Sequence, residues 1–386
     1  MDKLIKIFNY IFIRFFSLFP IKKNYIVFYS IPDYSDNAWA FFDYIRKKCG
    51  NKYKLIWLVK NMPEKKTGNV VFVNNTPKLF WLKRDYYLAV SKFVIITHSA
   101  PIRSWRKNQI FIHTKHSASQ LKSAVGFGEQ KNKKRKEADI QLICGQDGWD
   151  RNLSGHGYEE ETMIRIGMPR LDLLYRHKEC IPSLFPSANA SKTIIAMETF
   201  KQSKRWEDSS VSISFGLNMI SSEKELKELD AYLVQQKVLL IIKPHPLQVL
   251  DHIKIGELRN IRFLTDQMLA DHKIQLYQLL ENMDALITDY SSVYYDYLLL
   301  DRPIGFTLGD MESYKRGFII DNPLDEMTGE KIRNMSDLKV FIDHVLSGQD
   351  DYKDERAALI RRVFDHTDDK NCRRLYKFMV ENGLGR

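Results

Sequence analysis

Several histidines of this sequence stand at, or a few residues beyond, the ends of short apolar runs that predict strands. They are His98, His113, His116 and His245. Because an imidazole has a pKa near neutral pH, a histidine in such a place can accept the proton of an attacking hydroxyl group. A histidine that only forms hydrogen bonds within a loop is the plainer interpretation. The residue types alone leave open which of these histidines acts in catalysis.

His245 has a proline on each side, in the run Lys243-Pro244-His245-Pro246. Each proline fixes φ and neither continues a helix, so the imidazole is held where the preceding strand ends. Ligands of parallel α/β sheets bind beyond the carboxyl ends of the strands. The run therefore favours a functional histidine over one that only shapes a turn.

Residues 284–306 combine a strand end with a helix start. The apolar run 285–287 predicts a short buried strand, and residues 293–300 predict a helix. Between them, Ser291 and Ser292 can either cap the helix or donate hydroxyl groups to a ligand. The first turn of a helix has unpaired N–H groups and the positive end of the helix dipole, which suits it to bind a phosphate.

The elements around these residues alternate between short apolar runs and helical stretches, which predicts mostly parallel sheets covered on both faces. The expected strands are 25–28, 54–59, 70–73, 93–97, 109–112, 140–143, 193–197, 238–242 and 285–287. Residues 181–191 are rich in Pro, Ser and Ala and lack charge, which is typical of a linker. The expected domain boundary therefore lies between residues 185 and 186.

The whole chain has 386 residues, 44% hydrophobic and 28% charged, which is typical of a globular protein with room for two domains. Its formal net charge of +11 favours anionic partners, either a membrane lipid, a nucleotide diphosphate or a nucleic acid. Since the charge is dispersed and no nucleic-acid-binding module is recognised, no nucleic-acid partner is expected. The four cysteines are far apart, which fits a reducing, cytoplasmic setting.

Motifs for several nucleotide chemistries are missing. The sequence has no G-x-x-x-x-G-K-[ST], no G-x-G-x-x-G, and no D-x-D at an expected strand end. Their absence weakens ATPase, dinucleotide-binding and metal-dependent sugar-transfer interpretations. We therefore expect neither a metal nor a cofactor, and the charge of a leaving diphosphate would be offset by helix N–H groups, serines and basic residues.

Residues 3–19 predict an amphipathic helix that lies in a membrane interface. Polar and basic residues occupy one arc of the helical wheel and apolar and aromatic residues occupy the other. Arg14 interrupts a run already too short to span a bilayer, and no small-residue cleavage site follows it. Packing on the protein's own core is the alternative. The basic run 131–136 would add attraction to an anionic membrane, unless it is a solvated loop.

The run T-D-Y-S-S-V-Y-Y-D-Y-L-L-L-D-R-P at 288–303 resembles the signature of the CDP-glycerol glycerophosphotransferase family, which builds teichoic acids and related polymers. Further segments that resemble the family are S-D-N at 35–37, L-K at 121–122, G-M-P-R-L-D at 167–172, K-P-H-P at 243–246 and R-G-F-x-x-D at 316–321. The resemblance implies an α/β, GT-B-like fold, in which two Rossmann-like domains face a central cleft, and transfer of a polyol phosphate rather than a sugar.

The resemblance also implies roles for individual residues. His116 falls on the family's catalytic histidine, which deprotonates the acceptor hydroxyl, and His245 assists the diphosphate or the transfer. The implied donor-binding residues are Lys243, Asp289, Ser291, Ser292 and Arg316. The implied acceptor- or phosphate-binding residues are Lys122, Arg170 and Asp172, with Asp172 expected to hold Arg170 in place. Around His116 the family has W-H-G-T-P, whereas this chain has Lys115, Ser117, Ala118 and Gln120. The loss of the family's glycine restricts the backbone beside the base.

Together these inferences predict a membrane-interface helix at 1–21, an acceptor-side domain at 22–185 and a donor-binding domain at 186–386. The predicted reaction moves a polyol phosphate, glycerol phosphate in the first instance, from a CDP-polyol to a hydroxyl of a lipid-linked glycan or teichoic-acid-type acceptor and releases CMP. The protein is expected as a peripheral protein at the cytoplasmic face of the cell membrane. The alternative is a GT-B glycosyltransferase that uses a nucleotide sugar for cell-surface polysaccharide synthesis.

Overall fold

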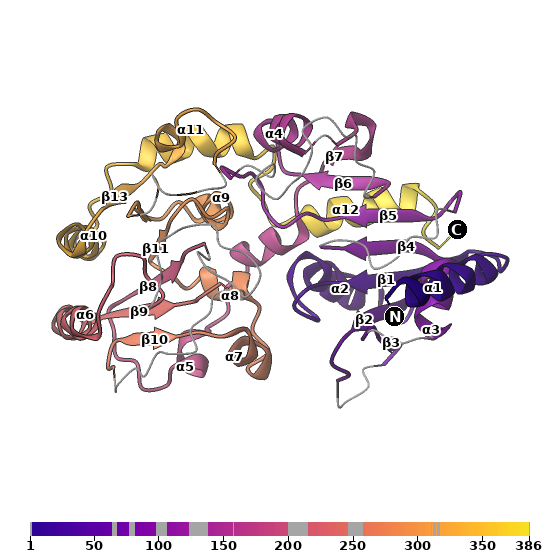
Figure 1. The fold of residues 1–386 in the computed structure, drawn as a ribbon, viewed down its shortest axis with the longest axis horizontal. Helices are drawn as coiled ribbons and strands as arrows, with labels where there is room; N and C mark the ends of the chain where they lie inside the picture. The colour runs from indigo at the N-terminus through magenta and orange to yellow at the C-terminus, as the bar shows by residue number, and fades with distance from the viewer. Residues whose placement is uncertain are drawn as a thin grey trace.

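Two parallel β-sheets form the two lobes visible in Figure 1. The computed structural model describes residues 2–63, 68–76, 82–97, 106–122, 138–156, 158–199, 215–245, 258–309, 311, 314 and 317–385. Every pairing between neighbouring strands of the two sheets is parallel. The predicted α/β class with two Rossmann-like domains is therefore confirmed.

The first sheet has the strand order β3-β2-β1-β4-β5-β6-β7. Its strands are β1 (Lys22–Tyr29), β2 (Lys54–Val59), β3 (Val70–Asn74), β4 (Ser91–Ile96), β5 (Ile110–His113), β6 (Ile140–Ile143) and β7 (Met163–Arg165). Six of them lie where short apolar runs predicted strands. β7 was not predicted, because its three residues include the exposed Arg165. The order of the strands reverses between β1 and β4, which is where such sheets bind ligands.

The second sheet repeats this plan with the order β10-β9-β8-β11-β12-β13. Its strands are β8 (Lys192–Met197), β9 (Val238–Ile242), β10 (Ile261–Phe263), β11 (Ala285–Thr288), β12 (Ile304–Thr307) and β13 (Glu330–Ile332). The sequence predicted β8, β9 and β11. It did not predict β10, β12 and β13, since β10 and β13 have three residues each with charged side chains among them, and Gly305 interrupts the apolar run of β12.

Helices cover both sheets. They are α1 (Asp2–Phe16), α2 (Asp36–Cys49), α3 (Leu82–Val90), α4 (Gln146–His156), α5 (Ile181–Leu184), α6 (Glu223–Gln236), α7 (Asp266–Asp271), α8 (Leu276–Leu280), α9 (Val293–Tyr297), α10 (Met335–Ser347), α11 (Lys353–Val363) and α12 (Asn371–Glu381). Short 3₁₀ helices include η3 (Pro169–Tyr175), η4 (Leu298–Leu300) and η6 (Pro323–Glu326). The helix predicted over 293–300 is thus α9 followed directly by η4.

Local sequence explains where several helices begin. The side chains of Ser222, Thr265 and Asn334 each accept a hydrogen bond from a first-turn N–H of α6, α7 and α10 respectively. Such caps satisfy backbone donors that have no partner within the helix. α10 ends at Gly348, whose φ of 78° is the left-handed conformation that glycine adopts without strain.

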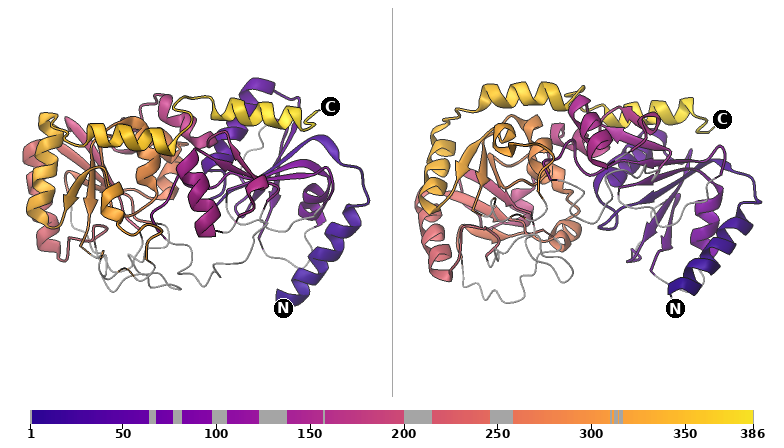
Figure 2. Two further views of the ribbon diagram at one scale, coloured as in Figure 1. Left: turned by 90° about the horizontal axis from the view of Figure 1, so that it is seen from above. Right: turned by 45° about the horizontal axis from the view of Figure 1, so that its top comes forward.

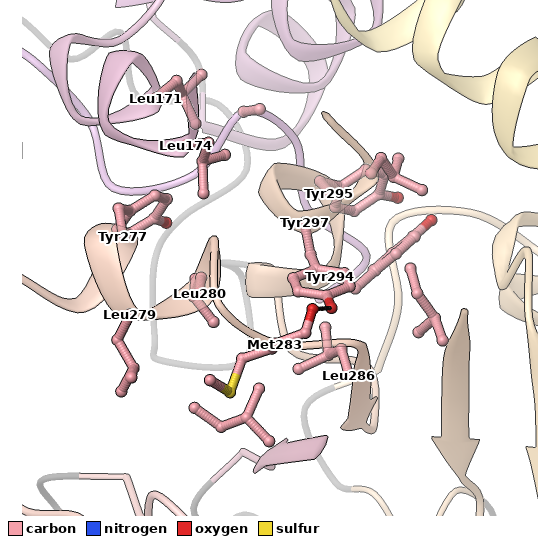
Figure 3. Packing of buried hydrophobic residues seen from close by; sticks show 14 of the residues in the cluster. Leu171, Leu174, Tyr277, Leu279, Leu280, Met283, Leu286, Tyr294, Tyr295 and Tyr297 are labelled. Carbon is pink, nitrogen blue, oxygen red and sulfur yellow. Dashed lines mark hydrogen bonds between the residues drawn. The ribbon is translucent and has the colours of Figure 1, made fainter. Parts of the chain in front are cut away.

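One hydrophobic core extends across both lobes. Leu171 and Leu174 of η3 belong to one buried cluster. The same cluster contains Leu280 of α8, Tyr294 of α9 and Met283, which lies between these two helices. Figure 3 shows these side chains on facing elements, with η3 above α8. The two lobes are therefore packed against each other by apolar contacts rather than joined by a chain connection alone.

The segments near the expected domain boundary are packed as well. Leu184 and Phe185, in the expected linker, are buried in the shared core. Beyond the second sheet the chain returns to the first lobe, because Cys372, Leu375 and Met379 of α12 pack in the core of the first sheet. Figure 2 shows the yellow C-terminal helices running from one lobe to the other. This return crossing is not part of the domain division predicted above, which itself stays a prediction.

Helix α1 lies at the outer edge of the first lobe (Figure 2). Ile13 is buried against the first sheet, and the ring of Phe16 contacts Tyr86 of α3. Asn9, which the helical wheel placed on the polar arc, is buried instead. In the described part of the chain, no helix is long and apolar enough to cross a bilayer.

Candidate active site

A cavity of about 300 Å³ lies between the two sheets. Its lining residues follow the carboxyl ends of β1 and β5 in the first sheet and of β8, β9 and β11 in the second. They include Tyr34, Asp36, His116 and Arg170 from the first lobe and Met197, His245, Ser291 and Ser292 from the second. Both histidines with implied catalytic roles thus share one cavity with both serines. The general expectation that ligands bind beyond the carboxyl ends of parallel strands agrees with this placement.

His113 and His116 occupy different environments. His113 is buried at the end of β5, with Nε2 3.2 Å from the carbonyl oxygen of Thr97. His116 is exposed and lines the cavity. Lys115 between them has a φ of 59°, so the backbone turns sharply just before His116. Of the two, only His116 is placed to meet a substrate in this cavity.

Asn37 fixes that turn from the start of α2. Its Nδ2 donates to the carbonyl oxygen of Lys115 at 2.9 Å, and its Oδ1 accepts from the backbone N–H of Arg170 at 2.9 Å. From the sequence, Asn37 is expected first as a structural residue that caps the helix after it. The sequence signal for its larger role was its position in the S-D-N segment that resembles the family. A buried amide there can form hydrogen bonds to two other segments of the chain.

His245 follows β9 and lines the cavity from the second lobe. The pKa of its imidazole is lowered from 6.5 to about 4, chiefly by burial and also by the charges of nearby Lys122 and Lys243, while Asp289 and Asp266 oppose the shift. At neutral pH the ring is therefore uncharged in the absence of a ligand. A neutral imidazole can still donate one hydrogen bond and accept another.

Ser291 and Ser292 lie between β11 and α9, on the cavity wall. Ser292 occupies the N-cap position of α9, yet its side chain makes no capping hydrogen bond. Behind the serines, the fully buried carboxylate of Asp289 accepts from the N–H of Ser291 at 2.9 Å and from the hydroxyl of Thr199 at 2.8 Å. Asp289 thus shapes the turn that presents the serines and does not itself line the cavity.

The predicted basic residues differ in their placement. Lys243 is buried and pairs with Asp266 at 2.8 Å, and Lys122 donates to the hydroxyl of Thr199 at 3.2 Å. Neither is among the residues that line the cavity, although both lie close enough to His245 to affect its pKa. Arg316 lies outside the described residues.

Arg170 lines the cavity, but the expected pairing with Asp172 is wrong. Its guanidinium pairs with Asp36 at 2.8 Å and with Asp296 at 2.6 Å. Asp172 is fully buried and accepts the backbone N–H groups of Asn371 and Cys372, both at 2.9 Å, where α12 begins. The pattern G-x-P-R-x-D could not reveal this, because the partner of its aspartate lies about 200 residues away.

Asp296 is a site residue that sequence reasoning missed, although the matched run contains it. It lies four positions after Ser292 in the otherwise apolar and aromatic segment Y-Y-D-Y, and it is fully buried. A carboxylate on the core side of a helix signals a charged or hydrogen-bonded partner, because an unpaired buried charge is very unfavourable.

Within the described ranges, no group of three or more His, Cys, Asp or Glu residues is arranged to hold a metal ion.

Two Rossmann-like sheets with a cavity between their carboxyl ends define a GT-B-like protein. Residues 11–381 match the sequence profile of the family described as CDP-glycerol:poly(glycerophosphate) glycerophosphotransferase. The chain therefore belongs to this family and is a transferase, as the resemblance of its motifs predicted.

Individual relatives agree with the family assignment. The chain is 27% identical over 348 residues to a teichoic acid poly(glycerol phosphate) polymerase of Bacillus spizizenii, with 82% of each sequence covered. It is 24% identical over 328 residues to a teichoic acid poly(ribitol-phosphate) polymerase of the same species, covering 79% of this chain but only 49% of that relative. The solved wall teichoic acid polymerase TagF has the same fold, with a TM-score of 0.75 at 20% identity over 97% of this chain and 93% of that one.

Proposed function

We propose that this transferase moves glycerol phosphate from CDP-glycerol to a hydroxyl group of a teichoic-acid-type acceptor and releases CMP. The proposal rests on family membership together with one observation, that His116 of the first lobe and His245 of the second line the same cavity as Ser291 and Ser292. A base and a phosphate-binding group on opposite walls are what an alcohol attack on a diphosphate requires.

In this mechanism the acceptor oxygen attacks the phosphorus that carries glycerol. A new P–O bond forms, the bond from that phosphorus to the oxygen of the CMP phosphate breaks, and CMP takes the bonding electrons. His116 accepts the proton of the attacking hydroxyl. Because phosphoryl transfer depends mainly on positioning and on stabilising charge, the surrounding donors supply most of the remaining rate enhancement.

The donor diphosphate would lie against Ser291 and Ser292, whose turn is shaped by Asp289. The neutral ring of His245 would donate a hydrogen bond to a phosphate oxygen. Lys243 and Lys122 stand close enough to His245 to lower its pKa and would add positive potential around the diphosphate. For Arg170 we propose a role on the acceptor side of the cavity, which it lines, and Arg316 stays a predicted donor contact.

We further propose that the protein acts as a peripheral protein at the cytoplasmic face of the membrane, on a lipid-linked acceptor. In support, α1 exposes Ile7, Tyr10, Ile11 and Phe15 by 52–57% on the side that does not pack on the lobe. A row of apolar and aromatic side chains on a helix surface is typical of insertion into a bilayer interface.

The deciding experiment measures CMP release from CDP-glycerol in the presence of a teichoic-acid primer, with CDP-ribitol and UDP-sugars as competing donors. We expect turnover of CDP-glycerol. Turnover of CDP-ribitol alone would replace glycerol by ribitol in the proposal. Turnover of UDP-sugars without CDP-polyols would overturn it in favour of glycosyl transfer.

A further inference from the structure

Asp296 connects the two walls of the cavity from a position that no substrate reaches. It lies on α9, close after Ser291 and Ser292, and its side chain is fully buried. Its Oδ1 accepts the backbone N–H of Ala118 at 3.0 Å. Its Oδ2 accepts from Nη2 of Arg170 at 2.6 Å and from the hydroxyl of Tyr277.

The groups that Asp296 holds on the first lobe flank the proposed base. Ala118 lies two residues after His116, and Nη2 of Arg170 also donates to the carbonyl oxygen of His116 at 2.5 Å. The turn 116–118 is thus tied to Asp296 at both ends, directly at Ala118 and through Arg170 at His116. Its backbone is therefore held by a side chain of the other lobe as well as by Asn37 of its own.

The position of the Arg170 guanidinium is set by two ion pairs, one to each lobe. Arg170 is buried, and its guanidinium is balanced by Asp36 of its own lobe and by Asp296 of the other. The ring of Tyr277 stacks on it, with the guanidinium carbon 4.5 Å from the ring centroid. Buried ion pairs add little net stability compared with apolar packing, but here one guanidinium bridges two carboxylates, so the loss of one carboxylate shifts the guanidinium toward the other. Without Asp296, Arg170 would be drawn to Asp36 alone.

We propose that Asp296 is a positioning residue for the transfer reaction, which holds the His116 turn of the first lobe against α9 of the second. The helix that follows the two serines thereby also sets where the base stands. This inference rests on the proposed function. Tyr277 supports it by donating its hydroxyl hydrogen to the same carboxylate oxygen that binds Arg170.

The kinetic test compares Asp296→Asn with the wild-type enzyme. The asparagine keeps the size of the side chain but turns one oxygen into an amide, so either the Arg170 or the Ala118 contact is lost. We expect kcat for CMP release to fall by about 10²-fold, which is the effect of a misplacement of roughly 1 Å at a reacting group. The KM for CDP-glycerol should change little, because the serines and His245 are untouched. Tyr277→Phe, which removes only one hydroxyl, should show a smaller loss in the same direction.

Tyr295→Phe is the matched control. It lies beside Asp296 on α9, and its hydroxyl also joins the lobes, donating to Glu326 at 2.7 Å and accepting from Arg151 at 2.9 Å. Neither partner belongs to the turn 116–118. We expect this variant to lose stability without the selective loss of kcat. A kcat for Asp296→Asn no lower than that of Tyr295→Phe, or a KM that rises as much as kcat falls, would overturn the proposal.

Hydrogen exchange gives a readout that does not require catalysis. In a peptide that covers residues 114–121, the Ala118 amide should exchange faster in Asp296→Ala than in the wild type, and not faster in Tyr295→Phe. Unchanged exchange in an enzyme that turns over CDP-glycerol overturns the positioning role and leaves the proposed function intact. Faster exchange in a protein that releases no CMP from CDP-glycerol shows that the contact exists, while both the proposed function and the catalytic consequence fail.

Discussion

The residue that decides most about this protein is His116. The resemblance to the family pointed to His116, but residue type and position alone could not separate it from His113, three positions earlier, since both follow a predicted strand. The structure separates them by burial, because β5 carries His113 into the core and the turn at Lys115 brings His116 to the cavity.

His116→Ala should lower kcat for CMP release by about 10²–10⁴-fold, which is the usual contribution of a general base. The thermal unfolding midpoint should stay near that of the wild type, because the side chain is exposed. His113→Ala is the control, and there we expect a lower midpoint with most of the activity retained. If His113→Ala lost activity at an unchanged midpoint and His116→Ala stayed active, His113 rather than His116 would be the base.

His245 gives a prediction for pH. Its pKa in the folded protein lies below the ordinary value, at about 4 against 6.5. As pH falls from about 6.5 to 4, the unfolded chain binds a proton that the folded chain does not, so the wild type loses stability. His245→Gln should escape this loss, which reaches about 3 kcal/mol at pH 4. Chemical denaturation of both proteins between pH 7 and pH 4 measures the difference, and parallel curves would contradict the low pKa.

Ligand binding should reverse that shift. A diphosphate beside His245 favours the protonated ring, so the pKa should rise when CDP-glycerol binds. Titration of the imidazole C–H signals by NMR, with and without donor, follows both states. A pKa that the donor leaves unchanged would place the diphosphate elsewhere.

At the scale of elements, α1 has two faces with different fates. Ile13 is buried, whereas Ile11 and Phe15 are exposed by 52% and 53%. The double variant Ile11→Ser, Phe15→Ser should bind phosphatidylglycerol vesicles several-fold more weakly in co-sedimentation, because apolar area is lost from the membrane-facing side. Its thermal midpoint should stay within a few degrees of the wild type.

Two controls make the test of α1 specific. Val340→Ser removes an exposed apolar side chain from α10 and should leave vesicle binding unchanged. Ile13→Ser should lower stability instead, because it places a hydroxyl in the core. If the double variant binds vesicles as strongly as the wild type, α1 is a helix that only packs on its own lobe.

Some strands and one site residue could not be predicted from the sequence. Short apolar runs predicted nine strands of this protein, but β7, β10 and β13 have three residues each with charged side chains among them, and Gly305 interrupts β12. The matched run 288–303 located the turn and α9, yet drew attention to its serines rather than to Asp296. Local patterns describe what a segment forms, whereas the partner of a buried charge depends on a segment far away in the chain.

At the scale of the whole molecule, the lobes share one core. Because the cluster that includes Leu171, Leu280 and Tyr294 spans both sheets, and α12 returns to the first lobe, we expect a single cooperative unfolding transition. Calorimetry should give one peak, with a calorimetric enthalpy equal to the van't Hoff enthalpy. Two separable transitions, or a fragment of residues 22–185 that folds alone with the full stability of its lobe, would contradict this expectation.

The sequence by itself determined the class of the fold, the family, and the segments in which the candidate site residues lie, because strand patterns, turn residues and family motifs are local properties of the chain. Only the tertiary structure decided that His116 rather than His113 meets the cavity, that Asp172 binds the start of α12, and that Asp296 holds the turn of the opposite lobe. Each of these outcomes depends on which distant groups become neighbours when the two lobes pack. Burial then fixes the partner, since a charge removed from water must be paired.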